Sequence, residues 1–175
     1  MMARIGSWAY MLTSKLAVAS ARTGDDPLRL AHRVRHLGDA YYYAGRAASA
    51  ESCYLEALSI YRRHERTSLL DLANAIRSFA VLKHESGAAL QAQGLWQEAH
   101  DLYVTLNATA GVAESAARLG LLARSQGDEQ QSREYLREAT EAAEAGADPE
   151  TIAYIRKVTA ELEGSSINGI RLTSR

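Results

Sequence analysis

A set of residue spacings recurs three times along this chain, and it constrains the fold more than any other feature. Each copy begins at a glycine and continues with small and large residues at intervals of five, four, three and four. The glycines lie 42 and then 40 residues apart. Such a period predicts an all-α superhelix of helical hairpins. The three copies are Gly45, Ala50, Tyr54, Ala57 and Tyr61; Gly87, Ala92, Trp96, Ala99 and Tyr103; and Gly127, Ser132, Leu136, Ala139 and Ala143.

Antiparallel helical hairpins give this spacing a physical cause. A glycine between two helices permits the sharp turn that reverses the chain, often with a positive φ. Seven residues earlier stands a small residue, where the backbones of the paired helices are expected to cross closely. Large residues in the following helix then fill the space between hairpins at interior density. The small residues are Gly38, Ala80 and Gly120, and the large ones are Tyr54, Trp96 and Leu136.

Capping residues place the ends of the expected helices. Asp26 and Asp148 each precede a proline, which gives an N-cap followed by a first-turn proline. Ser68 is a further cap, and Asp128 stands three residues before a glutamine, as in a capping box. Gly111 is expected just before the sixth helix. The expected helices cover about 7–21, 27–43, 47–64, 68–85, 88–105, 112–125, 128–145 and 149–163.

These helices divide the chain into three parts. Residues 1–24 form an N-terminal packing helix, residues 25–163 the solenoid, and residues 164–175 a disordered tail. The repeats are expected at about 28–64, 68–105 and 111–146, with a cap helix at 149–163. In the first helix Trp8, Leu12, Leu16 and Ala19 form the stripe expected to pack, although Ala19-Ser20-Ala21 also fits the cleavage site of a removed signal peptide. In the cap helix the packing stripe is Ile152, Ile155, Val158 and Leu162.

The charge of the chain limits which class of ligand it can bind, and its cysteine content indicates the cellular compartment. A net charge of −1 over 175 residues argues against nucleic acid as the ligand, and no apolar run reaches the length of a membrane span. The charge is uneven, with an excess of basic residues in 1–66 and of acidic residues in 128–163. Cys53 is the single cysteine, so it forms no intrachain disulfide and suits the reducing cytoplasm. We expect Cys53 to be a packing residue rather than a reactive thiol.

The pattern resembles the tetratricopeptide repeat over about residues 28–146. The first copy matches the signature of that family at Leu37, Gly38, Tyr41, Gly45, Ala50, Tyr54 and Ala57. The second copy has Lys83 in place of the tyrosine, and the third has Ala123, Ser132 and Leu136 at variable positions. The long period resembles the variant found in kinesin light chains. The resemblance implies a protein-interaction module rather than an enzyme.

In this family the first helix of each hairpin lines the concave side, which implies a binding face. The arginines there offer forked donors for a carboxylate or phosphate, and the asparagine can pair with a peptide backbone. We expect a peptide or a partner helix to lie on this face. The alternative is that these are solvated residues of a scaffold that binds elsewhere. The residues are Arg35, Asp39, Tyr42, Asn74, Arg77, Val81, His84, Arg118, Leu121 and Arg124.

Other functions receive less support from the residues. His32 and His36 stand four apart and could share a metal, but neighbouring arginines disfavour a cation. Asp39 and Glu114 would repel a partner's C-terminal carboxylate, which argues against the carboxylate clamp of some family members. The sequence has no phosphate-binding glycine loop and no nucleophile elbow, so we expect no enzyme activity and no cofactor. Two alternatives remain: a homo-oligomer that stacks its basic end on its acidic end, and a regulatory subunit of a separate enzyme.

Overall fold

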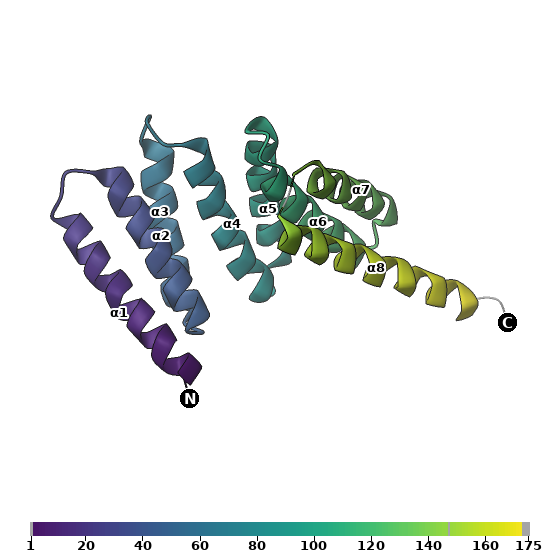
Figure 1. Ribbon diagram of the computed structural model, residues 1–175, viewed down its shortest axis with the longest axis horizontal. Helices are drawn as coiled ribbons and strands as arrows, with labels where there is room; N and C mark the ends of the chain where they lie inside the picture. Colours follow the sequence, from purple (N-terminus) through teal and green to yellow (C-terminus); the bar gives the residue numbers. More distant parts are fainter. Residues whose placement is uncertain (1, 147, 173–175) are drawn as a thin grey trace. The chain divides into compact units, whose positions relative to one another are not determined.

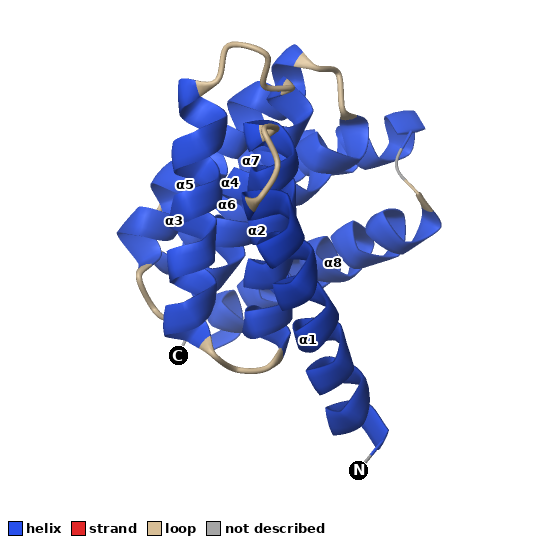
Figure 2. Ribbon diagram, turned by 90° about the vertical axis from the view of Figure 1, so that its left-hand side faces the viewer, coloured by secondary structure: helices blue, strands red, loops and turns tan. Residues whose placement is uncertain are grey.

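The computed structural model describes the backbone of residues 2–146 and 148–172, and the side chains of residues 9–146 and 148–160. Every element in these ranges is an α-helix, joined by short loops (Figure 2). The all-α fold predicted from the repeat spacing is therefore confirmed. The helices are α1 (Met2–Arg22), α2 (Pro27–Tyr43), α3 (Ala47–Arg63), α4 (Leu69–Glu85), α5 (Ala89–Thr105), α6 (Thr109–Ser125), α7 (Glu129–Gly146) and α8 (Pro149–Leu172).

The chain folds as two compact units, Met1–Ala99 and His100–Arg175, with the boundary inside α5. In the first unit α1 packs beside α2, α2 and α3 form a hairpin, and α3 packs against α4 (Figure 1). In the second unit α6 and α7 form a hairpin, and α8 packs against both helices (Figure 1). The helix that follows the last hairpin thus packs on that hairpin, and its role as a cap stays a prediction.

The three repeat glycines lie in the turns between paired helices, as the spacing predicts. Gly45, Gly87 and Gly127 have φ values of 71°, 79° and 83°. An L-residue rarely adopts this left-handed conformation, whereas glycine adopts it without steric cost. Each glycine can therefore end one helix and reverse the chain within about three residues.

The expected N-caps are also present. Asp26 accepts hydrogen bonds from the backbone N–H groups of Leu28 and Arg29 at 3.0 and 3.1 Å. Asp128 accepts one from the N–H of Gln131 at 2.9 Å. Asp148 likewise caps α8 through two backbone N–H groups. These bonds satisfy N–H groups that have no partner within the helix.

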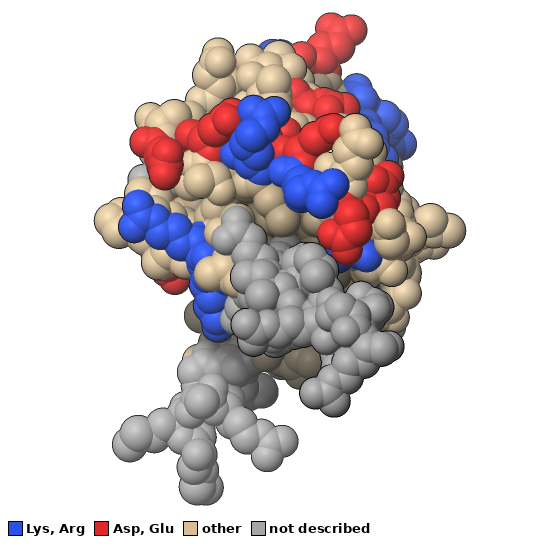
Figure 3. Space-filling view, turned by 90° about the vertical axis from the view of Figure 1, so that its right-hand side faces the viewer, with Lys and Arg blue, Asp and Glu red and all other residues tan. Residues whose placement is uncertain are grey.

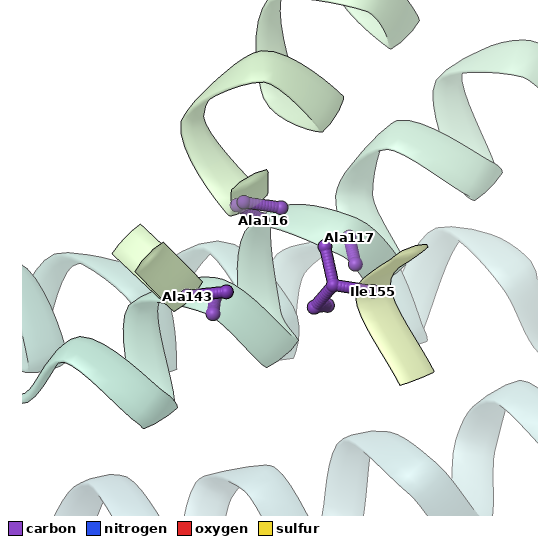
Figure 4. Packing of buried hydrophobic residues seen from close by; sticks show 6 residues of the cluster. Ala116, Ala117, Ala143 and Ile155 are labelled. Atoms are coloured by element: carbon purple, nitrogen blue, oxygen red, sulfur yellow. The ribbon is translucent and has the colours of Figure 1, made fainter. Parts of the chain in front are cut away.

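Small residues let the paired helices approach closely. A Cβ atom placed on Gly120 would lie 3.0 Å from Cγ of Leu136, so α7 packs directly on the backbone of α6. In the same unit Ile155 of α8 is buried with alanines from both helices (Figure 4). Ile155 and Val158 confirm the inner stripe predicted for the cap helix, while Leu162 lies outside the described side chains. The buried alanines are Ala113, Ala116, Ala117, Ala139 and Ala143.

The packing stripe predicted for the first helix is wrong. Leu12 and Leu16 are 42% and 63% exposed, whereas Ser14, Val18 and Ala21 are buried. Apolar and small residues occur on both sides of α1, so the apolar pattern alone does not determine which side faces α2. The side chain of Trp8 lies outside the described residues.

Two helix ends also differ from expectation. Gly111 lies inside α6, which begins at Thr109, because the glycine sits against the ring of Tyr103 rather than at a turn. The last helix does not end before Gly164, since α8 continues to Leu172. Extending a helix costs far less than nucleating one, and no proline interrupts this segment. The tail expected to be disordered is thus helical to Leu172, and residues 173–175 lie outside the described part.

Candidate functional site

A small hollow lies between α2 and α4 in the first unit. Its volume is about 110 Å³, well below the several hundred Å³ of sites that enclose a small molecule. It can receive one side chain of a larger ligand. Four of the predicted site residues line it, together with three that were not predicted to bind. The lining residues are Asp39, Tyr42, Tyr43, Tyr54, Arg77, Ser78 and Val81.

A hydrogen-bonded cluster forms the floor beside this hollow. The hydroxyl of Tyr54 donates to Oδ1 of Asp39 at 2.9 Å, and Nη1 of Arg35 donates to Oδ2 at 3.2 Å. Nη2 of Arg35 lies 3.0 Å from Nε2 of His36. Because a guanidinium only donates, this nitrogen of His36 accepts, and Nδ1 carries the proton 3.5 Å from Oδ2 of Asp39.

Arg35 is engaged within this cluster, and its predicted contact with a ligand stays a prediction. Its side chain is 12% exposed, and its fork is directed at Asp39 and His36 rather than at solvent. Asp39 is 18% exposed and accepts from three neighbours, so the two residues stabilise the α2–α3 hairpin. The spacing of four residues that joins them is the usual spacing of a helical ion pair.

Electrostatics keep Asp39 ionised. Burial alone would raise the pKa of its carboxyl, but hydrogen bonds from His36 and Tyr54, together with the charge of Arg35, lower the pKa below its usual value. Burial and the nearby carboxylate raise the pKa of Tyr54 far above its usual value, so its hydroxyl stays a donor. The negative charge is therefore held next to the hollow.

Residues at the rim of the hollow differ in what they present. Tyr42 is half-buried, and its hydroxyl donates to Glu85 at the end of α4 at 2.5 Å. The neighbouring Tyr43 is 74% exposed and stacks edge-on against Tyr42. Val81 offers a partly exposed apolar side chain, and Arg77 is half-buried. Asn74 and His84 are also half-buried on α4 but do not line the hollow.

The remaining predicted residues belong to α6 in the second unit. Arg118 lies over the ring of Tyr154 on α8, 5.4 Å from the ring centroid. Nε of Arg124 is 4.0 Å from a carboxylate oxygen of Glu129 at the start of α7. Leu121 is half-buried. Arg118 therefore contributes to packing of the cap helix.

A second hollow, shallower and more apolar, lies between α3, α4 and α5 of the first unit. Its volume is about 470 Å³, and Leu55, Leu90 and Phe79 contribute apolar surface. Leu90 is 81% exposed. At one side Nζ of Lys83 donates to Glu51 at 2.6 Å and lies over the ring of Phe79. Lys83, which replaces the tyrosine of the first copy, thus packs on the core, and its charge is paired with Glu51.

A histidine and a serine, residue types that are common in catalytic sites, are both buried in the described part of the chain. Nδ1 of His100 lies 3.0 Å from Oγ of Ser115, and Nε2 lies 3.3 Å from Glu138. Ser115 is fully buried, so these side chains link α5, α6 and α7. Burial and the charge of Glu56 raise the pKa of the Cys53 thiol to about 11, as expected for a packing residue. Among the described residues, no group of three metal-ligating side chains is assembled.

Two family models match this chain, and both describe the tetratricopeptide repeat. One matches residues 30–65 and the other residues 113–145. These segments are the first and third copies of the spacing, each folded as a helical hairpin. The chain contains tetratricopeptide repeats in these two segments. No curated protein matches its sequence at a significant level.

Solved structures of other repeat proteins share the fold at low sequence identity. BtubC (BKLC) from P. vanneervenii matches with a TM-score of 0.76 and 20% identity over 91% of this chain. Aspartyl phosphate phosphatase F from Bacillus subtilis matches with a TM-score of 0.68 and 18% sequence identity over 87% of this chain. The N-terminal domain of stress-induced protein-1 (STI-1) from C. elegans matches with a TM-score of 0.57 and 14% sequence identity over 78% of this chain. This repeat protein spans 66%, 42% and 99% of those chains, respectively.

The family assignment makes the chain a protein-interaction module in general terms. No helix in the described residues has both the length and the apolarity needed to cross a bilayer. Sequence reasoning missed Tyr43 and Ser78 at the hollow. The position of Tyr43 was a signal for this contact. It is the last residue of α2, directly after Tyr42, and a side chain at a helix end readily projects past the last turn.

Proposed function

We propose that this repeat protein binds an extended peptide or a partner helix on the α2–α4 face of its first unit. The observation that carries the proposal is the hollow between these helices, which combines an aromatic rim with polar groups. Its size suits one anchoring side chain of a longer ligand. Peptide recognition of this kind takes selectivity from such side-chain pockets.

Each residue on this face has a proposed role. Tyr43 and Val81 supply apolar contact, and an exposed tyrosine orders at low entropic cost on binding. Asn74 pairs with a peptide backbone group, and Arg77 donates to a carboxylate or a carbonyl of the ligand. Arg35 and Asp39 position the face instead of contacting the ligand.

In the second unit Leu121 and Arg124 are proposed as separate partner contacts. We infer a non-enzymatic role without a cofactor, since the reactive groups described above are engaged in packing. A cytoplasmic location fits the single buried thiol.

Affinity capture from native lysate tests the proposal. The double variant Asn74→Ala/Arg77→Ala should lose a partner that the wild type and the matched control Leu90→Ala/Gln91→Ala both retain. Because Asn74 and Arg77 also make contacts within the chain, Val81→Glu provides a second test with a smaller structural effect. Circular dichroism must show unchanged helicity in all variants. Equal capture by wild type and both test variants would place the interface elsewhere.

A second candidate is self-association of the basic part of the chain with the acidic part. The uneven charge of residues 1–66 and 128–163 favours it. Figure 3 shows, however, that Lys and Arg side chains stand among the acidic ones on one face, and Arg137 pairs with Glu141 at 2.9 Å. Sedimentation at low and high salt separates the candidates, because charge-driven stacking weakens in salt. If the chain instead regulates a separate enzyme, that enzyme should be the captured partner.

A further inference from the structure

The first helix, α1, carries an apolar stripe on each of two opposite sides. The inner stripe packs towards α2 through Met11, Ser14, Val18 and Ala21. The outer stripe is exposed and has spacings of three, four and three residues. This spacing is that of a helix paired with another helix. The outer stripe consists of Ala9, Leu12, Leu16 and Ala19.

Over residues 9–22 of α1, where side chains are described, the outer side lacks the charged residues that normally face water. A surface helix usually places charged and polar residues opposite its apolar face. The charged residues in this range are Lys15 and Arg22, and both contact groups in the rest of the unit. Lys15 lies over the ring of Tyr41, and Arg22 donates to both carboxylate oxygens of Glu56 at 3.0 Å.

Two hydroxyl groups near this outer side already have a hydrogen-bond acceptor within the chain. Thr13 and Thr23 donate to the backbone carbonyls of Tyr10 and Ser20 at 2.9 Å. They can therefore be covered without leaving an unpaired donor, which would cost free energy. The outer face of α1 thus has the composition of a buried surface.

The order of residues in the outer stripe identifies what can cover it. The residue types and spacings of the stripe are the same in both chain directions: alanine, leucine, leucine and alanine at spacings of three, four and three. These residues are Ala9, Leu12, Leu16 and Ala19. In an antiparallel pair of identical helices, Leu12 faces Leu16 of the second copy and Ala9 faces Ala19 of the second copy. A two-fold interface requires this self-complementarity, in which residue i meets j and j meets i.

We propose that the chain forms a homodimer in which α1 pairs antiparallel with α1 of a second copy. Charges beside a helical seam help to set the choice of partner. Here the two nearby charges, Lys15 and Arg22, contact groups of their own chain, so they do not oppose pairing with a second copy. This dimer is independent of the proposed peptide-binding face, and its uncharged interface should resist salt, unlike charge-driven stacking.

Sedimentation velocity of the full chain at micromolar concentrations tests the dimer. Wild type should sediment as a dimer at both low and high salt. Leu16→Glu should raise the dissociation constant at least about tenfold, as expected for a central interface residue. The matched control Leu90→Glu changes a leucine on α5 that is even more exposed than Leu16 and should leave the dimer intact. A wild-type monomer, a dimer lost in high salt, or equal effects of the two variants would overturn the proposal.

Mixing two variants tests the antiparallel arrangement. Leu12→Lys and Leu16→Glu should each be monomeric alone, with helicity unchanged by circular dichroism. Their mixture should form a dimer again, because the positive charge of the Leu12→Lys chain then faces the negative charge of the Leu16→Glu chain, while Leu16 of the first chain faces Leu12 of the second. In a parallel pair the new charges would not meet. Failure of the mixture to dimerise would overturn the antiparallel pairing. If Leu16→Glu does not fold, the effect of Leu12→Lys on dimerisation tests whether this side of α1 forms the interface.

Discussion

The ring of Tyr54 lies directly on the backbone of Gly38. A Cβ atom at Gly38 would be 2.7 Å from Cε1 of this ring, closer than any real side chain allows. Tyr54 is almost fully buried, and its ring centroid is 6.2 Å from that of Phe79 on α4. One large residue thus fills the space left by the missing side chain of one helix and also reaches the next hairpin.

Replacement of Gly38 by alanine should destabilise the chain. The new methyl group would force the buried ring of Tyr54 to move, which typically costs about 1–3 kcal/mol. Gly94, inside α5, is the matched control because a Cβ there meets nothing within 4 Å. Gly94→Ala should stabilise the protein by about 0.5–1 kcal/mol through helix propensity. Urea unfolding measures both, and equal changes of the same sign would refute the close approach.

Asp39→Asn should lower the free energy of unfolding. The substitution leaves the largely buried Arg35 guanidinium without its anionic partner, at a cost of about 1–3 kcal/mol. Chemical denaturation at pH 7 measures this loss. Arg35→Lys would test the geometry, because a lysine lacks the fork that reaches both Asp39 and His36. A variant as stable as wild type would show that the pair is not structural.

The contribution of Asp39 should also depend on pH. Its native pKa lies below its unfolded value of about 3.9. The unfolded state therefore binds a proton first as pH falls, and the stabilisation is complete above about pH 5. It is lost as pH falls through the native pKa. The stability difference between wild type and Asp39→Asn should shrink between pH 5 and pH 3, and a constant difference would contradict this assignment.

Cys53 should react slowly with a disulfide reagent at pH 8. Its pKa of about 11 leaves little thiolate, and its side chain is buried. Reaction should accelerate to the rate of a free thiol when the chain unfolds in urea. Rapid native-state labelling would contradict this prediction and indicate that the α2–α3 packing opens.

Turns and core positions were predictable because each depends on short-range chemistry. Gly45, Gly87 and Gly127 need left-handed backbone, and Asp26 and Asp128 cap helices through bonds that span only two or three residues. The inner residues of the hairpins followed from the repeat spacing itself.

Other features depended on contacts between distant residues. Gly111 was expected before a helix, but it accommodates the ring of Tyr103 and so lies within one. On α1 two faces have apolar spacing, and only the packing on α2 distinguishes them. Arg35 was expected to bind a ligand, although its spacing of four from Asp39 was a signal for the pair that forms.

Site-specific photo-crosslinking on the α2–α4 face tests the central claim most directly. A photo-reactive amino acid at Val81 lines the proposed binding hollow, and one at Leu90 lies on α5 beside the other hollow. We predict that the partner captured by the wild type crosslinks to position 81 and not to position 90. Crosslinking at position 90 alone, or equally at both positions, would contradict the account.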